Sequence, residues 1–250
     1  MLVIRPSSGL SGDMTLAGLA CMAGADSQEL GAIAALIGLP RDCVALERRA
    51  VNEVFGWGCR VTLPDTTAHR TWADIRTLIA RSGLSASAKT LAERTFALLA
   101  EAEGRVHGIP TGEVHFHEVG ALDSILDICV CAELFARLSP SRLVCGPLPL
   151  CDGTVKCEHG LLPAPAPAVF ELLKGVTVRG ISSEGETVTP TAIALLKGLG
   201  AEFGAWPEMT IERTALVYGG RVLPGVANGA LFALGSATRT AASENTGSAA

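Results

Sequence analysis

The sequence predicts an α/β protein in which one mixed β-sheet is covered by helices, with an α+β arrangement as the alternative. Strand patterns and helix patterns alternate along most of the chain, which is typical of α/β proteins. Residues 44–51 and 58–63 also alternate like a hairpin, so the sheet should be mixed. The 250 residues fit a single large domain, which we place at 1–235, followed by a disordered tail at 236–250.

Composition restricts the function classes. The net charge is -5 and no basic run occurs, which argues against nucleic acid as the main partner. No secretory signal pattern opens the chain, and no apolar run approaches the ~20 residues of a membrane span. We therefore expect a soluble, cytoplasmic protein without a membrane partner, and we expect a homo-oligomer. The eight cysteines are scattered, and we expect buried free thiols rather than disulfides.

The N-terminal elements begin with a strand at 2–5, a small-residue loop at Pro6–Gly12 and a helix from Asp13 to Ala23. A strand, a glycine-containing loop and a helix in succession can cradle an anion with backbone amides. The alternative for Asp13 is a plain helix cap. Thr71 to Asp74 resembles a capping box, and Ser85 is the expected cap of a longer helix. The helices expected up to this point lie at 13–23, 27–37, 72–80 and 85–106.

The C-terminal elements continue the alternation. Prolines at every second position from Pro163 to Pro167 predict a stiff, extended segment, which would hold His159 on a well-defined loop. Pro190 suits the first turn of a helix. One expected helix ends at about residue 138. Two more lie at 168–174 and 190–203. The expected strands lie at 142–145, 154–157, 176–181, 209–218 and 229–234.

The segment HFHEVGALDSILDI (115–128) carries the clearest chemical pattern. In an extended segment His115 and His117 share one face, and Glu118 follows directly. Asp123 and Asp127 are neighbours on the helix that comes next. Imidazoles with carboxylates are ligands for zinc, nickel, manganese or iron. The alternative is a helix N-terminus with ordinary carboxylate capping beside two surface histidines.

Several stretches together resemble the LarC family of nickel insertion proteins, over most of residues 1–220. These are SSGLSGDM (7–14), HRTWADI (69–75), VHGIPTGEVHFHEVGALDSILDI (106–128), KCEHGLLPAPAPAVFELLKG (156–175) and GETVTPTAIALL (185–196). The resemblance implies a cyclometallase, an enzyme of the lyase class. It would insert nickel into pyridinium-3,5-bisthiocarboxylic acid mononucleotide, using CTP with manganese or magnesium. The product would be the nickel-pincer cofactor of lactate racemase and related enzymes.

The resemblance and the residue chemistry together give a candidate site. Soft thiocarboxylates can take nickel from harder imidazole and carboxylate ligands, so a transient donor site should use the latter. The candidate metal ligands are His115, His117, Glu118 and Asp127. The candidate catalytic residues are Asp13, Asp123 and His159. For the substrate and its phosphate we expect Ser8, Gly9, Ser11 and Gly12 of the loop, with Arg70 and Lys156 as counter-charges.

Departures from the family pattern leave alternatives open. Arg5 and Pro6 stand where the family has an acidic residue and a cysteine, Ala192 replaces a glycine, and a Gly-Thr-Arg run is reduced to 218–221. No part of the sequence resembles the nucleotide-binding C-terminal domain of the family, so we expect a separate C-terminal subunit that carries the CTP site. One alternative is a non-catalytic carrier of nickel or cofactor. The other is a metal-dependent hydrolase.

Overall fold

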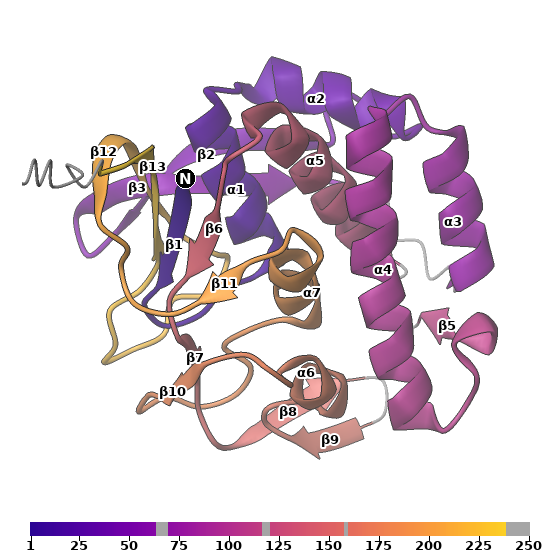
Figure 1. The fold of residues 1–250 in the computed structure, drawn as a ribbon. Helices are drawn as coiled ribbons and strands as arrows, with labels where there is room; N and C mark the ends of the chain where they lie inside the picture. The colour runs from indigo at the N-terminus through magenta and orange to yellow at the C-terminus, as the bar shows by residue number, and fades with distance from the viewer. Residues whose placement is uncertain (64–69, 117–120, 158–159, 239–250) are drawn as a thin grey trace, which may run out of the picture.

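A computed structural model describes residues 1–63, 70–116, 121–157 and 160–238 of the chain. Within these ranges the chain forms seven α-helices and a mixed seven-stranded sheet, which confirms the predicted α/β class (Figure 1). The helices are α1 (Gly12–Ala23), α2 (Ser27–Leu36), α3 (Trp72–Arg81), α4 (Ala86–His107), α5 (Leu122–Leu138), α6 (Pro167–Leu172) and α7 (Pro190–Gly198). A 3₁₀ turn, Thr111–Glu113, follows α4.

The large sheet combines parallel and antiparallel pairs. Its first three strands in spatial order, β11 (Glu202–Phe203), β6 (Leu143–Cys145) and β1 (Leu2–Pro6), are parallel. Strand β1 then pairs antiparallel with β13, and β13 with β12. The remaining order is β13 (Ala230–Ala237), β12 (Met209–Val217), β3 (Val54–Val61) and β2 (Val44–Val51). Three small two-stranded sheets pair β4 (Arg70–Thr71) with β5 (His115–Phe116), β7 (Leu148–Leu150) with β10 (Val178–Gly180), and β8 (Thr154–Cys157) with β9 (Gly160–Pro163).

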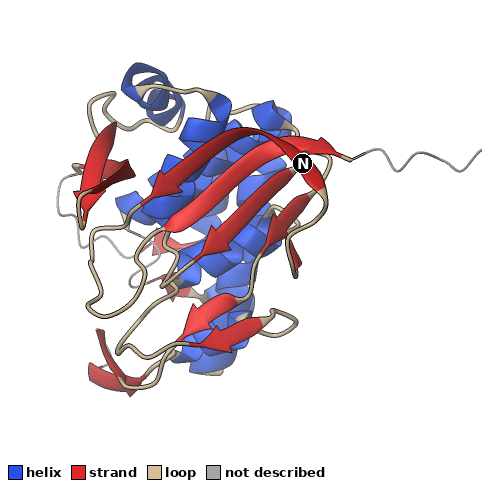
Figure 2. Ribbon diagram, turned by 90° about the vertical axis from the view of Figure 1, so that its left-hand side faces the viewer, coloured by secondary structure: helices blue, strands red, loops and turns tan. Residues whose placement is uncertain are grey.

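The described helices lie on one face of the large sheet (Figure 2). Helix α1 lies against β3, β12 and β13, with α5 and α7 beside it, and α4 packs outside that layer. Side chains alternate along β1, so Leu2 and Ile4 join the main core under the helices. Val3 points to the other face, where it forms a small buried cluster with Val144 and Ala233. The sheet thus has one helix-covered face and one open face.

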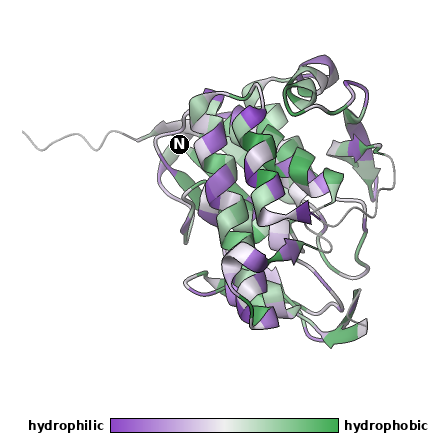
Figure 3. Cartoon of the chain, turned by 90° about the vertical axis from the view of Figure 1, so that its right-hand side faces the viewer, coloured by the Kyte–Doolittle hydropathy of each residue, from purple (hydrophilic) through white to green (hydrophobic). Residues whose placement is uncertain are grey.

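Local capping signals set the starts of the outer helices, as predicted. Thr71 and Asp74 form a complete capping box at α3, and Ser85 accepts a hydrogen bond from the amide of Ala88 at α4. The amide of Ser85 in turn donates to the buried carboxylate of Glu133 in α5, at 2.9 Å. Hydrophilic and hydrophobic residues alternate along the outer helices (Figure 3). Helix α4 is therefore amphipathic: its apolar side packs against α5 and its polar side faces solvent.

Two of the predicted boundaries differ from the structure by four residues or more. The β2–β3 hairpin turns directly at Asn52 and Glu53, which both have positive φ (50° and 66°), so β3 begins at Val54 rather than Gly58. A two-residue turn of this kind matches the twist of an antiparallel pair. Helix α7 ends at Gly198 instead of reaching 203, and Gly200 takes a positive φ of 81°. The released chain then forms the edge strand β11.

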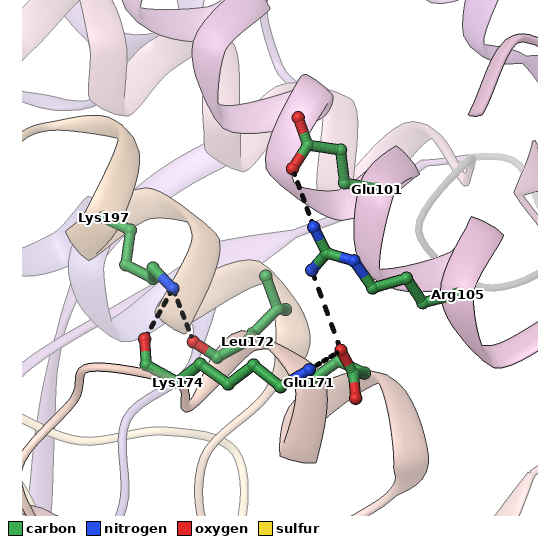
Figure 4. A network of polar contacts seen from close by, with 6 residues as sticks. All are labelled: Glu101, Arg105, Glu171, Leu172, Lys174 and Lys197. Atoms are coloured by element: carbon green, nitrogen blue, oxygen red, sulfur yellow. Dashed lines mark hydrogen bonds and ion pairs between the residues drawn. The ribbon is translucent and has the colours of Figure 1, made fainter.

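A polar network fastens α6 to α4 and α7 (Figure 4). The ammonium group of Lys197 in α7 donates to the carbonyl oxygens of Leu172 and Lys174, at 2.9 and 3.0 Å. These oxygens belong to the C-terminal end of α6, where carbonyls lack helical partners. The guanidinium group of Arg105 in α4 forms two ion pairs: Nη2 lies 3.4 Å from Oε2 of Glu101, and Nη1 lies 3.7 Å from Oε2 of Glu171. Lys197 therefore caps α6 from outside.

The remaining predictions at this level have mixed outcomes. All eight cysteines are free and six of them are buried, which confirms the expected thiols. Strand β13 continues to Ala237, two residues past the predicted domain boundary at 235, and residues 239–250 lie outside the described part of the chain. Among the described helices, none combines the length and the apolar character needed to cross a membrane.

Candidate functional site

Three helix N-termini, those of α1, α5 and α7, open onto one cleft beside the sheet. Two adjoining hollows of about 460 and 220 Å³ share Ser11, Asp13, Glu186 and Thr189 in their walls. The larger hollow is also lined by Cys59, Asp123 and Asp127. We call the combined space the carboxylate cleft, because four acidic side chains line it: Asp13, Asp123, Asp127 and Glu186.

The loop at 7–12 is fastened to the segment before α7. The amide of Leu10 donates to the carbonyl of Thr187 at 2.9 Å, and the amide of Thr189 donates to the carbonyl of Leu10 at 3.1 Å. A β-carbon on Gly9 would lie 2.3 Å from the oxygen of Thr187, so glycine permits this close approach. The loop therefore forms a rigid wall of the cleft, and the amide of Leu10 is already in use.

Gly12 and Asp127 bring α1 and α5 together at the floor of the cleft. A β-carbon on Gly12 would lie 2.3 Å from Oδ2 of Asp127, so the carboxylate occupies the space a side chain would take. Asp127 is 8% exposed, and its Oδ1 is buried without a hydrogen-bond partner among the described residues. Buried polar atoms are nearly always paired. Among the described residues, the Asp127 carboxylate is therefore the cleft group whose hydrogen-bonding capacity is left unused.

Charge inside the cleft favours a cation. Burial raises the pKa of Asp127 well above its usual range, and the negative charges of Asp13 and Asp123 raise it further. The raised pKa favours the protonated form of Asp127 when no cation is near, and a divalent ion would compete with that proton. Asp13 lies in the first turn of α1, and its carboxylate accepts a hydrogen bond from the Ser11 hydroxyl. The helix N-terminus stabilises its negative charge.

Cys59 of β3 adds a thiol to the same wall. Burial raises the pKa of Cys59 far above the ordinary value, and the negative charges of Asp127, when it is ionised, and of Asp13 raise it further. The group therefore remains a thiol near neutral pH, and a thiol is a much weaker metal ligand than a thiolate. A site of this kind binds a soft metal less firmly than a cluster of thiolates would.

Seven of the predicted site residues come together at the carboxylate cleft. The loop contributes Ser8, Gly9 and Ser11, α1 contributes Gly12 and Asp13, and α5 contributes Asp123 and Asp127. Their positions agree with the expected juxtaposition of loop and carboxylates, although their roles stay predictions.

Other predicted residues lie elsewhere or outside the described part of the chain. His115 is exposed on β5, paired with Thr71, and its neighbours Val114 and Phe116 are buried, as the alternation predicted. Arg70 lies on β4 and the exposed Lys156 on β8, and neither lines the cleft. His117, Glu118 and His159 lie outside the described residues.

A complete ligand set is not assembled by the described residues alone. Among them, no three His, Cys, Asp or Glu side chains lie close enough together to hold a metal ion. The predicted set of His115, His117, Glu118 and Asp127 stays a prediction, because His117 and Glu118 fall outside the description. Among the described carboxylates of the cleft, Asp127 is the one with a buried oxygen that lacks a described partner.

Sequence reasoning assigned no role to three cleft residues. Glu186 lies within a recognised motif, GETVTPTAIALL, which was the available signal. Arg221 also lines the cleft and donates to the carbonyl of Glu186 at 3.3 Å, in the run that departs from the family pattern. Cys59 had no local signal, since only the tertiary fold brings β3 to α5.

A mixed-sheet α/β domain whose cleft is lined by four carboxylates, one of them buried, has the features of a protein that handles divalent cations. The chain belongs to the nickel insertion protein family, which matches residues 2–247. No solved structure matches the chain.

Named relatives agree with this family. The chain is 39% identical over 218 residues to the pyridinium-3,5-bisthiocarboxylic acid mononucleotide nickel insertion protein of Nocardioides sp., covering 87% of this chain and 55% of that protein. It is 43% identical over 223 residues to a relative from Pelobacter propionicus that carries the family's name, covering 88% and 57%. The chain thus spans about half the length of these relatives.

Proposed function

We propose that this chain takes part in inserting nickel into pyridinium-3,5-bisthiocarboxylic acid mononucleotide, and that the carboxylate cleft is where nickel meets the pyridinium ring. The observation that carries the proposal is the Asp127 carboxylate, which lines the cleft of a chain from this family and whose buried Oδ1 has no partner among the described residues. The substrate class comes from the name of the Nocardioides relative.

Asp127 and Asp13 have different roles in the proposed reaction. Asp127 binds the incoming Ni²⁺ through its unpartnered oxygen and releases its proton. Forming the carbon–nickel bond breaks a ring carbon–hydrogen bond, so the leaving proton needs an acceptor close by. Asp13, at the start of α1, is that acceptor. The two thiocarboxylate sulfurs of the substrate are softer ligands than carboxylate oxygen, so they draw nickel out of the cleft.

An incomplete protein ligand set suits such a transfer. A storage site surrounds its metal with protein ligands, whereas a transfer site leaves positions for the acceptor. The described residues offer carboxylates and a protonated Cys59, with no group of three ligands, so the sulfurs of the substrate can complete the coordination. This supports a chain that passes nickel on.

The test combines nickel binding with nickel transfer. We expect Asp127→Asn to weaken Ni²⁺ binding at least about tenfold by calorimetry. Asp13→Asn should retain binding but lower activation of an apo lactate racemase by about 10²- to 10⁴-fold, the usual range for a lost general base. The control is Asp26→Asn, because asparagine caps a helix as well as the exposed Asp26 caps α2. Unchanged nickel binding in Asp127→Asn would disprove the assignment.

We further propose that CTP, with manganese or magnesium, acts through a separate C-terminal subunit. The support is the resemblance to the LarC family, in which a C-terminal domain binds the nucleotide. Racemase activation should then need both CTP and that second polypeptide. Multi-turnover activation by this chain alone would contradict this part of the proposal.

One second candidate is a non-catalytic carrier of nickel or of the cofactor, because the described residues alone assemble no group of three ligands. A carrier would bind Ni²⁺ through Asp127 but would show no transfer under any combination of CTP and partner. The family match gives no support to the hydrolase alternative.

A further inference from the structure

A second cavity lies on the other side of the 7–12 loop from the carboxylate cleft. It measures about 570 Å³ and opens directly beyond the carboxyl ends of the parallel strands β1 and β6, where Pro6 and Gly146 contribute to its wall. Open α/β sheets bind their ligands in the crevice outside the carboxyl ends of parallel strands. The position alone makes this cavity a candidate binding site.

The charge of the cavity is positive. Arg5, at the end of β1, and Arg179, in β10, both line it, and no aspartate or glutamate is among the described residues of its wall. Ser7 and Ser182 add two hydroxyl groups. Two guanidinium groups with hydroxyls nearby are the donors that bind phosphate.

Both guanidinium groups are held in place by the fold. Arg5 donates from Nη1 to the carbonyl of Gly204 at 2.8 Å and lies 5.6 Å from the ring centroid of Trp206. A β-carbon on Gly146 would lie 2.7 Å from Cζ of Arg5, so glycine leaves room for the guanidinium. Arg179 donates from Nη2 to the carbonyls of Pro6 and Ser7. A guanidinium has five N–H donors, and these bonds use one terminal nitrogen of each.

The 7–12 loop therefore separates two opposite environments. Ser7 lines the cavity with the arginines, whereas the next residue, Ser8, lines the carboxylate cleft. The amides of Ser7 and Leu10 already donate to the carbonyls of Gly229 and Thr187. A phosphate in the cleft would meet the negative charges of Asp13 and Glu186, while a phosphate in the cavity would meet two fixed cations.

We propose that the cavity formed by Arg5 and Arg179 binds a phosphate monoester. This inference goes beyond nickel insertion and does not depend on it, because phosphate binding is measured without metal. It also gives a function to Arg5, which departs from the family pattern. The same chemistry could come from free phosphate or from a mononucleotide, and the probes distinguish these sources.

The experiment is calorimetry at low ionic strength in the presence of EDTA. The probes are inorganic phosphate, ribose 5-phosphate, nicotinic acid mononucleotide and the phosphate-free nicotinic acid riboside. The parent should bind both monoesters and not the riboside. Arg5→Gln and Arg179→Met should each weaken monoester binding about 10- to 100-fold, as expected for a lost hydrogen bond to a charged group. Arg179→Lys should recover part of the loss, since it keeps the charge.

Two control variants test whether monoester binding depends on arginines outside the cavity. Arg142→Met removes an exposed arginine that pairs with Glu202 and lines neither space, so it should leave binding unchanged. Arg221→Met removes the arginine of the carboxylate cleft and should also leave monoester binding intact. If Arg5→Gln does not fold, as judged by circular dichroism, the Arg179→Met and Arg179→Lys pair decides.

Three results would overturn the proposal. The parent could bind neither ribose 5-phosphate nor nicotinic acid mononucleotide, and no inorganic phosphate. Binding could depend on Arg221 and not on Arg179, which would place the phosphate in the carboxylate cleft. Inorganic phosphate could bind while both monoesters do not, which would make the cavity a site for a free inorganic anion.

Discussion

The α-carbon of Gly12 lies directly beneath the carboxylate of Asp127, so closely that a methyl group at position 12 would come within 2.3 Å of Oδ2. This contact joins α1 to α5 at the floor of the carboxylate cleft. The size of the residue at position 12 therefore determines where the Asp127 carboxylate can lie. A substitution at Gly12 would displace that carboxylate while residue 127 stays an aspartate.

We predict that Gly12→Ala pushes Asp127 out of position. The added methyl group should lower the free energy of unfolding by about 1–3 kcal/mol, as overpacking in a core does, and should weaken nickel binding. Urea unfolding and calorimetry measure the two effects. Gly112→Ala is the matched control, because nothing lies within 4 Å of a β-carbon at that position. Equal stability and equal nickel affinity in Gly12→Ala and the parent would show that the contact has no consequence.

Asp127 should also make stability depend on pH. Its pKa in the folded chain is raised by burial and by Asp13 and Asp123, so the folded state keeps a proton that the unfolded state loses above pH ~4. The stability that this proton contributes is complete below that pH and is lost progressively as the pH rises. Asp127→Asn cannot lose a proton, so its stability relative to the parent should increase as the pH rises above about 4.

Urea unfolding in EDTA at several pH values measures this difference. EDTA is required because a bound cation would compensate the ionised carboxylate. Asp26→Asn, at the exposed cap of α2, provides the comparison. A difference between Asp127→Asn and the parent that stays constant across this range would contradict the assignment.

Lys197 should anchor α6 more strongly than the surrounding ion pairs do. Lys197→Met removes two hydrogen bonds to carbonyl oxygens at the end of α6 (Figure 4), and we expect a loss of about 1–3 kcal/mol. Lys174→Met removes only an exposed pair with Glu171, and exposed pairs contribute about 0–1 kcal/mol. Hydrogen exchange of the α6 amides should therefore accelerate in Lys197→Met and change little in Lys174→Met. The reverse order would assign the anchoring role to the ion pairs.

Local chemistry explains which features the sequence predicts. Thr71 with Asp74 and Ser85 cap their helices through hydrogen bonds within three residues, so their patterns are visible in the chain. The end of α7 depends instead on the neighbouring β6, which draws Glu202 and Phe203 into the sheet. A helix pattern that runs on to residue 203 cannot reveal that competition.

The same distinction holds for the candidate site. Asp123 and Asp127 were recognised from their spacing on one helix, and the 7–12 loop from its composition. The contact between Gly12 and Asp127, and the place of Cys59 beside them, arise only when α1, α5 and β3 pack together. The unpaired oxygen of Asp127 is likewise a property of the folded chain.

The carboxylate cleft takes its walls from segments far apart in the chain, which begin with Ser8 and end with Gly229. Contacts so far apart in the chain must overcome the entropy of closing long loops, and they form late in folding. During synthesis the wall nearest the N-terminus is made first, and the cleft stays incomplete until the segment 218–229, well after α7, has emerged. Metal binding at this cleft should therefore follow folding, so that only a fully folded chain would hold nickel.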